Sequence, residues 1–343
     1  MKFDRIKGSR LPAEWEQQSR VQLTWPTMES DWGPIFEEVE QCFINIAKTI
    51  SRYQGVIIVS PNSSIPWKKL SGANCNMKNI TTASIPTNDS WARDHGAISL
   101  KTPDGIQILD FKFNGWGLKY PANHDNQITK NLFLQGQLSG TYHNMQHIVL
   151  EGGSIESDGQ GTLMTTTECL LSDNRNSWMT KDEIEEQLKT IFNLNRVLWL
   201  DHGYIEGDDT DGHVDTLARF CSPDTIAYVK CYDQEDDLFY YLDEMENELL
   251  SWKQENGEPY RLIPLPLPAP VYYEDRRLPA TYANFLILNG AVLVPTYHQE
   301  ETDKEALSAL GSFFEDRDVI GIDCSSLIKQ NGSLHCVTMQ YYK

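Results

Sequence analysis

The sequence is poor in positive charge. Its 343 residues contain 29 Lys and Arg but 49 Asp and Glu, which gives a formal net charge of -20. Nucleic acids and anionic membrane surfaces both attract basic segments, so we expect neither as a partner. No run reaches the roughly 18 consecutive apolar residues that a membrane span needs. An acidic cleft would instead attract a small cation, although most of this charge is explained simply by solubility.

The sequence also lacks the cysteine spacing of a disulfide framework or a zinc ribbon. It has seven cysteines, an odd number, and no pair has Cys-x-x-Cys spacing. This pattern indicates free thiols in a reducing compartment. The chain begins Met-Lys-Phe-Asp-Arg-Ile-Lys and continues without the apolar core of a secretion signal. We therefore expect a cytoplasmic protein.

No linker or low-complexity tract divides the chain. The length alone allows either two domains or one large one. Hydrophobic residues make up 40% and charged residues 23%, as in an ordinary globular protein. In the one proline cluster, Pro264–Pro270, apolar residues alternate with prolines. This predicts an extended or edge segment rather than a domain boundary.

Apolar residues spaced three and four apart predict five helices. They cover roughly residues 35–50, 126–138, 180–191, 238–252 and 302–310. Two of these helices open with capping boxes, Thr180–Glu183 and Thr302–Glu305. The helix near residue 238 follows an acidic turn, which favours a helix N-terminus.

Short strand-like runs lie between the predicted helices. The clearest is a hairpin, in which the turn Asn289-Gly290 separates two apolar runs. The other runs are residues 21–25, 55–59, 106–113, 147–155, 163–171, 197–200, 213–220, 226–230 and 333–340. The chain thus consists of five strand-rich units with one helix each. This is a mixed α/β pattern, and five helices with a hairpin argue against a TIM barrel.

Common catalytic motifs are missing. The sequence has no phosphate-binding Gly-x-x-x-x-Gly-Lys-Ser/Thr loop, no Gly-x-Gly-x-x-Gly and no Gly-x-Ser-x-Gly elbow. The acidic run Gly207–His213 fails as a calcium loop, because Gly207 and Ala218 occupy the first and closing ligand positions.

Two segments combine acids with glycines or aromatic residues. Thr87–Gly96 crowds acids around a tryptophan, although a capped loop with a surface Asp89–Arg93 pair would look the same. Leu150–Ser154 places a carboxylate at a strand end before two glycines. Those glycines permit close approach by a ligand or another backbone, and a bulged strand end is the alternative.

Two further segments carry histidines. On a strand, His213 and Asp215 would share one face and suit acid–base chemistry, with a structural pair as the alternative. Four acids lie just upstream, at Glu206, Asp208, Asp209 and Asp211. Near the C-terminus, Cys336 is a candidate nucleophile. The neighbouring His335 would face away from Cys336 on a strand, so we do not expect it to be the base.

Together and in this order, these segments resemble the agmatine deiminase family of the guanidine-modifying superfamily, which also contains the bacterial peptidylarginine deiminase. The resemblance covers essentially the whole chain. It is carried by Leu23–Pro26, Asn88–Asp94, Phe113–Gly117, Leu150–Glu156, Asn174–Asn176, Gly207–Asp215, Tyr282–Phe285 and Leu334–Cys336. It implies one catalytic domain over residues 1–343 with a five-bladed α/β propeller fold, the pentein, of pseudo-fivefold ββαβ-type units.

The resemblance also implies roles for the candidate residues. Asp94 and Asp215 would bind a guanidinium bidentately, and Cys336 would attack its central carbon. His213 would protonate the leaving ammonia and then activate water, with an amidino-cysteine intermediate between these steps. Glu151 would position the histidine and the substrate nitrogens. No metal or organic cofactor is required, and a homodimer is implied by the family alone.

The expected substrate is agmatine, converted to N-carbamoylputrescine and ammonia. Asp209 resembles the family's partner for the distal amine, with Asp208 or Asp211 as alternatives, and Trp91 would cover the butyl chain. The family usually carries a run of glycines before the cysteine, whereas here only Gly332 is glycine.

Three other functions compete with agmatine deimination. They are deimination of free or peptidyl arginine, a metal-dependent hydrolase using His213, Asp215 and Asp208–Asp211, and a polyamine-binding protein without activity. The expected acids around the distal end argue against an arginine carboxylate, and binding alone would not need a thiol.

Overall fold

The computed structural model describes residues 6–343. Residues 1–5, which contribute to the expectation of no secretion signal, lie outside the described residues. Within that range, no helix is both long and apolar enough to cross a membrane.

Four three-stranded sheets repeat one connection. In each, the first strand pairs antiparallel with the second, and the second pairs parallel with the third after a helical crossover. The four sets of strands are Ile98–Thr102 (β4), Gly105–Lys112 (β5) and Thr141–Val149 (β6); Ile155–Ser157 (β7), Thr162–Thr166 (β8) and Arg196–Leu200 (β9); Ala218–Ser222 (β10), Thr225–Lys230 (β11) and Arg261–Pro266 (β12); and Leu286–Leu288 (β15), Ala291–Thr296 (β16) and Asp318–Asp323 (β17).

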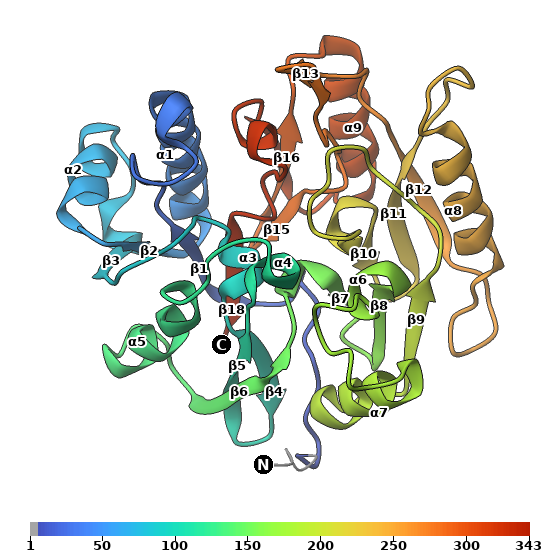
Figure 1. The fold of residues 1–343 in the computed structure, drawn as a ribbon, viewed down its shortest axis with the longest axis horizontal. Coiled ribbons are helices and arrows are strands. Elements are labelled where there is room, and N and C mark those ends of the chain that lie inside the picture. Colours follow the sequence, from blue (N-terminus) through green and yellow to red (C-terminus); the bar gives the residue numbers. More distant parts are fainter. Residues whose placement is uncertain (1–5) are drawn as a thin grey trace.

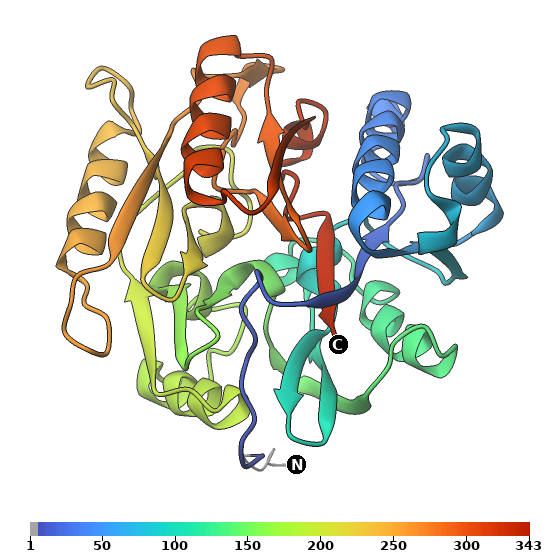
Figure 2. The same cartoon turned by 180° about the vertical axis from the view of Figure 1, so that it is seen from behind.

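The fifth sheet joins the two ends of the chain. Gln18–Thr24 (β1) runs parallel with Gly55–Ser60 (β2), which runs parallel with Ile80–Ser84 (β3). The last strand, Thr338–Tyr342 (β18), pairs antiparallel with β1. Seen from behind, β18 and the N-terminal segment lie side by side at the centre (Figure 2). The C-terminal strand therefore supplies the antiparallel strand that the first unit lacks.

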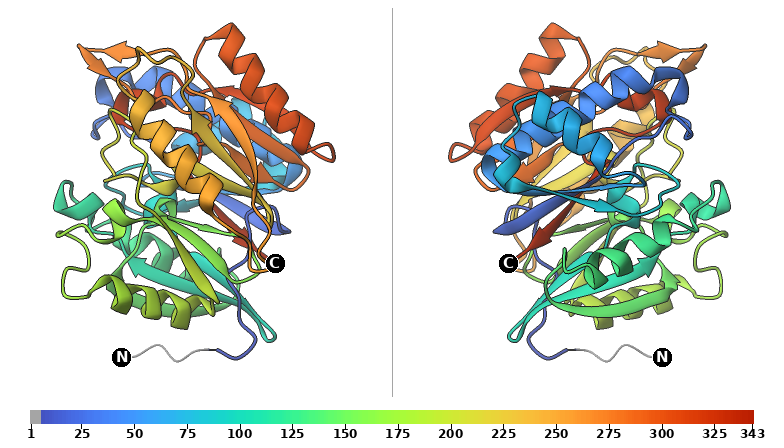
Figure 3. Two further views of the ribbon diagram at one scale, coloured as in Figure 1. Left: turned by 90° about the vertical axis from the view of Figure 1, so that its right-hand side faces the viewer. Right: turned by 90° about the vertical axis from the view of Figure 1, so that its left-hand side faces the viewer.

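The five sheets surround a common centre, occupied by β18 and the short helices Ala92–His95 (α3) and Gly115–Leu118 (α4) (Figure 1). The longer helices lie on the outside, as the two side views show for α8 and for α1 with α2 (Figure 3). This arrangement confirms the five-bladed α/β propeller.

All five predicted helices are present, together with one further helix longer than a single turn that was not predicted. They are Phe36–Tyr53 (α1), Ile128–Leu134 (α5), Lys181–Phe192 (α7), Phe239–Ser251 (α8) and Glu300–Phe313 (α9), and the additional helix is Ser64–Gly72 (α2). The first capping box is confirmed, because Thr180 and Glu183 exchange side-chain and backbone bonds. The second is wrong. Helix α9 begins before Thr302, and the Asp303 carboxylate accepts the Gln299 N–H at 2.9 Å.

Several predicted strands end earlier or begin later than expected. The run 147–155 is split between β6 and β7 by a 3₁₀ turn, Gly152–Ser154, and 163–171 divides into β8 and the helix Thr167–Leu170 (α6). The runs 213–220 and 333–340 become strand only at Ala218 and Thr338. At three of these places, the non-strand residues are those nearest the centre of the molecule, where the candidate catalytic side chains lie.

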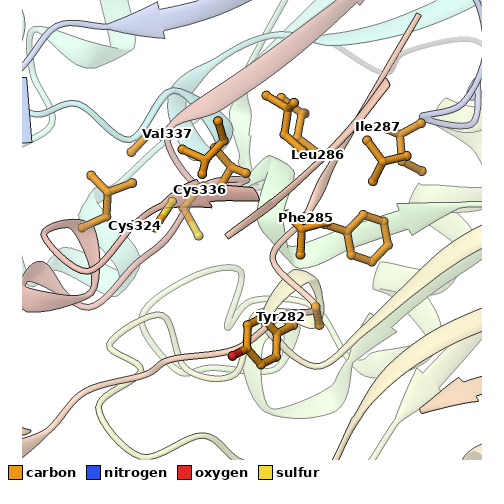
Figure 4. Packing of buried hydrophobic residues seen from close by; sticks show 14 of the residues in the cluster. Tyr282, Phe285, Leu286, Ile287, Cys324, Cys336 and Val337 are labelled. Atoms are coloured by element: carbon orange, nitrogen blue, oxygen red, sulfur yellow. The ribbon is translucent and has the colours of Figure 1, made fainter. Parts of the chain in front are cut away.

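The remaining elements are short. Tyr272–Tyr273 (β13) and Arg276–Arg277 (β14) form a small hairpin, and the other 3₁₀ turns are Gly33–Ile35, Met77–Asn79, Asp125–Gln127, Val214–Thr216 and Leu327–Gln330. The Asn289-Gly290 hairpin forms as predicted between β15 and β16. The proline cluster begins in β12, which is an edge strand. Cys336 lies beside buried apolar residues that include Val337 and Leu286 (Figure 4).

Candidate active site

The five predicted catalytic residues converge from distant parts of the chain. Asp94 lies on α3, Glu151 follows β6, His213 and Asp215 lie at the 3₁₀ turn before β10, and Cys336 lies in the turn before β18. Each side chain belongs to a residue that is at most 4% exposed.

Gly153 shows how closely three of these residues approach one another. A Cβ atom built on Gly153 would lie 2.5 Å from His213 Nδ1, 2.9 Å from Asp94 Oδ1 and 3.2 Å from Asp215 Oδ2. All three atoms therefore surround one point, and only glycine leaves room there. The predicted close approach of another backbone is found at the preceding Gly152, where an added Cβ would lie 2.3 Å from Arg93 O.

His213 is held between two carboxylates. Its Nε2 lies 3.0 Å from Glu151 Oε2, and its Nδ1 lies 3.6 Å from Asp94 Oδ1. Burial lowers the pKa of His213, but Asp94, the Cys169 thiol and Glu151 outweigh burial, so that the pKa rises well above its usual value. His213 is therefore protonated at neutral pH and can donate a proton.

Glu151 is itself fixed by a buried guanidinium. Arg175 donates from Nε at 3.0 Å to Glu151 Oε2, and its Nη2 lies 2.9 Å from the same oxygen. Burial raises the pKa of Glu151, but His213 and Arg175 lower it by more. Glu151 therefore remains a carboxylate that can orient His213.

Asp94 accepts two hydrogen bonds from neighbouring loops. Trp116 Nε1 donates to Oδ2 at 2.9 Å and Gly153 N donates to Oδ1 at 3.1 Å. Burial, together with the nearby charges of Asp215 and Glu151, raises the pKa of Asp94 to about 6. A cation bound next to Asp94 would lower this pKa and thereby favour the charged carboxylate.

Trp116 reaches Asp94 through an unusual turn. Its φ is +53°, and the flanking Gly115 has φ +68°. A Cβ built on Gly115 would lie only 2.1 Å from Tyr120 O. Glycine is required at position 115 because both the positive φ and the lack of space exclude a side chain.

The predicted strand geometry of His213 and Asp215 is wrong, since both lie at a 3₁₀ turn. Asp215 instead faces His335, whose Nδ1 lies 2.7 Å from Asp215 Oδ2. Burial raises the pKa of Asp215, but the bond and charge of His335 outweigh it, so that the pKa is lowered. His335 also lies before a strand rather than on one, and its two ring nitrogens face Asp215 and Glu14.

The Cys336 thiol lies against Asn284 and Asp215. Its Sγ is 3.4 Å from Asn284 Oδ1 and 3.9 Å from Asp215 Oδ2. Burial and the charges of Asp215 and Asp94 raise its pKa well above the usual value. In the free protein, burial and the nearby carboxylates therefore favour the thiol over the thiolate.

An open cavity lies against Cys336 and Asp94. Its walls include Trp91 and Trp116, and four of its lining residues are acidic: Asp31, Asp89, Asp94 and Asp209. No lysine, arginine or histidine lines it among the described residues. The cavity is therefore suited to a cation with an apolar chain.

The acids considered for the distal amine differ in their surroundings. Asp209 lines the cavity, where Lys119 lies 3.0 Å from its Oδ1 and Tyr120 donates to its Oδ2 at 2.7 Å. Asp208 accepts bonds from its own loop, and Asp211 pairs with Arg175 and Lys119. Neither of these two alternatives lines the cavity, whereas Asp31 and Asp89, which were not considered for the distal amine, both do.

The reduced glycine run before Cys336 has a structural explanation. Asn331 adopts φ +68°, a left-handed conformation that asparagine tolerates better than most residues. Gly332 packs against Trp91, and a Cβ built on it would lie 2.3 Å from the Trp91 ring. One glycine and one asparagine thus satisfy the requirements of this loop.

We expect Gly332→Ala to displace Trp91 and to lower kcat/KM for the reaction proposed below by about tenfold, because overpacking typically costs about 1–3 kcal/mol. Steady-state kinetics and thermal unfolding would measure the effect. Gly72→Ala is the matched control, since nothing lies within 4 Å of its added Cβ. Equal kinetics for both variants would contradict this account of the loop.

The residues proposed for a metal-dependent hydrolase do not share a ligand position. His213 contacts Glu151, Asp215 contacts His335, and the upstream acids bond elsewhere. In the described residues, donor atoms do gather at Glu151, Cys169 and His213, and again at Glu14, Glu156 and His335. Arg175 already forms an ion pair with Glu151 in the first group. Arg219 already forms ion pairs with Glu14 and Glu156 in the second group.

Four site residues were not predicted individually: Trp116, Arg175, Asn284 and His335. The first three lie inside segments that carry the family resemblance, so their positions were marked although their roles were not. His335 was considered only as a base. Its actual partners could not be inferred, because they are distant in sequence.

Comparisons with known proteins place the chain in a family. Residues 10–341 match the family model described as Porphyromonas-type peptidyl-arginine deiminase. The agmatine deiminase of Medicago truncatula is 31% identical over 97% of this chain and 96% of its own length. A structure from Porphyromonas gingivalis, provisionally described as an arginine deiminase, is 48% identical with a TM-score of 0.92, and 98% of each chain is covered. The structure of a Cys→Ser variant of C. jejuni agmatine deiminase with substrate bound is 37% identical with a TM-score of 0.90, again over 98% of each chain. The chain belongs to the Porphyromonas-type peptidyl-arginine deiminase family.

Proposed function

We propose that this protein is an agmatine deiminase, which hydrolyses agmatine to N-carbamoylputrescine and ammonia. The observation that carries the proposal is the convergence of Asp94, Asp215, His213 and Cys336 at the end of an acidic cavity. The names of the M. truncatula and C. jejuni relatives support this activity.

The carboxylates are arranged for a guanidinium. Asp215 Oδ1 and Glu151 Oε1 are buried and have no hydrogen-bond partner among the described residues. Leaving such acceptors unpaired is costly, and a guanidinium supplies N–H donors in a planar fork. We assign Asp94 and Asp215 to the guanidinium and Glu151 to the orientation of His213 and the substrate nitrogens.

Substrate binding prepares the nucleophile. The positive guanidinium offsets the negative charges of Asp94 and Asp215, which raise the pKa of the Cys336 thiol in the free protein. The thiol then loses its proton to solvent more readily, and the thiolate forms a C–S bond with the central guanidinium carbon as the C=N π electrons move onto nitrogen. No metal or organic cofactor takes part in this step.

His213 carries the proton through the remaining steps. It donates a proton to one nitrogen of the tetrahedral adduct, the C–N bond breaks, and ammonia leaves an amidino-cysteine. The neutral His213 then removes a proton from water as the oxygen bonds to the same carbon. The C–S bond breaks last, as the hydroxyl group on the same carbon loses its proton to solvent and becomes the carbonyl, which regenerates the Cys336 thiolate and releases the ureido product.

The distal ammonium of agmatine binds at the acidic end of the cavity. We assign it to Asp209, and Trp91 covers the butyl chain. Asp209 exchanges its contact with Lys119 for the substrate amine. An arginine carboxylate would meet the same acids, which disfavours free arginine as a substrate.

We expect Asp209→Asn to lower kcat/KM for agmatine by about 10- to 100-fold, the range for a lost hydrogen bond between charged groups. The value for N-butylguanidine, which lacks the amine, should change little. Asp89→Asn and Asp31→Asn are the matched comparisons. If one of these two variants instead removes the preference for agmatine, the assignment of Asp209 is wrong.

The function itself is tested with purified protein in EDTA, supplied with agmatine, arginine or a blocked arginine peptide. We expect ammonia and ureido product from agmatine. Turnover of arginine or the peptide instead would retain the mechanism and change the substrate. Thermal stabilisation by agmatine without turnover would favour a polyamine-binding protein.

Three further expectations belong to this proposal. The catalytic domain spans residues 1–343, the protein acts in the cytoplasm, and it forms a homodimer. Light scattering coupled to size-exclusion chromatography would determine the oligomeric state.

A further inference from the structure

We propose that His335 is a positioning residue, held as an imidazolium by Glu14, that keeps Asp215 ionised and correctly oriented for the guanidinium. This inference rests on the proposed function, because it takes Asp215 to be a substrate ligand. It concerns residues behind the catalytic group, on the side away from the substrate cavity.

Both ring nitrogens of His335 face carboxylate oxygens. Nδ1 lies 2.7 Å from Asp215 Oδ2, and Nε2 lies 2.7 Å from Glu14 Oε2. A neutral imidazole has only one N–H and can donate to only one of them. Arg219 Nη2 also lies 3.0 Å from Nε2, but Nε2 is nearer to the Glu14 oxygen. Two carboxylate contacts of 2.7 Å are therefore best satisfied when both nitrogens carry protons.

The charges around His335 balance only when it is positive. The facing groups are Glu14 from the N-terminal segment, Asp215 from the 3₁₀ turn, Glu156 from β7, Arg219 from β10 and Arg93 from α3. These are three carboxylates and two guanidinium groups, and all five residues are at most 6% exposed. An imidazolium at His335 makes this buried group neutral, and buried charges persist only when they are paired.

Glu14 connects several blades at the centre of the propeller. Arg219 Nη2 donates to its Oε2 at 2.9 Å, and the backbone N–H of Ile287 on β15 donates to its Oε1 at 2.7 Å. Figure 2 shows the N-terminal segment reaching the centre of the molecule from behind. The carboxylate that holds His335 is thus itself held by two neighbouring blades.

Arg93 ties the same loop to α3. Its backbone N–H donates to Cys336 O at 3.1 Å, and its Nε donates to His335 O at 3.4 Å. The loop backbone is therefore fixed independently of the His335 ring. Replacing the ring should change the environment of Asp215 more than the path of the chain.

The test compares His335→Asn with His143→Asn. Asparagine can still donate one bond to Asp215, but it removes the positive charge and the bond to Glu14. We expect kcat/KM for agmatine to fall by about 100-fold, as when one donor to a reacting group is removed. The acid limb that belongs to Asp215, which lies below the limb of Asp94, should move to higher pH by about one unit, because loss of a neighbouring cation raises a carboxyl pKa.

His143 is a suitable control because it lies on β6 and bonds to Gln107. Its variant should keep the wild-type pH profile. If His335→Asn lowers the melting temperature but leaves the acid limb in place, His335 is merely structural and the inference fails. Glu14→Gln, which removes the opposing charge, should move the limb in the same direction, and an unmoved limb would again overturn it.

A neutron crystal structure of the wild-type protein at neutral pH tests the inference without any variant. We expect deuterons on both ring nitrogens of His335. His95 provides an internal reference, since burial lowers its pKa to about 3 and it should carry only one. A neutral His335 would overturn the inference even if the variants do not fold. Absence of turnover by the wild-type protein would instead overturn the proposed function.

Discussion

Cys336→Ala is expected to lower agmatine turnover by about 10⁴-fold or more, because removal of a nucleophile leaves only binding and electrostatic contributions to the rate. Asp94 and Asp215 remain in place, so agmatine should still bind and raise the melting temperature. Ammonia release and thermal unfolding would measure the two effects separately.

The matched control is Cys221→Ala. Cys221 is also buried, and burial raises its pKa to about 12, but it lies outside the cavity. We expect wild-type kinetics for this variant. Substantial turnover by Cys336→Ala would contradict a covalent mechanism. It would instead support direct attack on the substrate by water that His213 activates.

The structure adds a condition to this mechanism. The Cys336 thiol is held protonated by burial and by the carboxylates that bind the substrate cation. Thiolate formation is thus coupled to occupation of the site. Because a thiol is less reactive than a thiolate, this coupling protects Cys336 when the open cavity holds no guanidine.

Much of the local structure could be predicted from neighbouring residues. The capping box at Thr180, the Asn289-Gly290 hairpin and the helix near residue 35 depend on local hydrogen bonds and periodicity, and all three form. The box at Thr302 failed because Asp303 caps the helix instead. Two competing caps within one turn cannot be distinguished by spacing alone.

The candidate site was predictable as a set of residues but not as a geometry. Strand periodicity placed His213 and Asp215 on one face, whereas the chain leaves the strand there and turns toward the centre. The contact between Glu14 and His335 joins residues 321 positions apart. Such a contact leaves no local pattern, because it depends on how five blades close around one axis.

The charge of Asp94 provides the last prediction, and its sign follows from the raised pKa. Because the pKa of Asp94 is about 6 in the free protein, the carboxyl is neutral below that pH and cannot pair with a guanidinium. We therefore expect kcat/KM to fall as the pH decreases through about 6. Asp94→Asn should lower kcat/KM by about 10³-fold at neutral pH, since truncating a buried charge pair costs about 2–5 kcal/mol, and the limb assigned to Asp94 should disappear. Asp110→Asn is the control, because Asp110 is also buried with a pKa of about 6 but bonds to Tyr142. An acid limb that survives in Asp94→Asn would have to come from another group. The expected electrostatic effect of Asp94 would then be missing, and only geometry would support its assignment to the guanidinium.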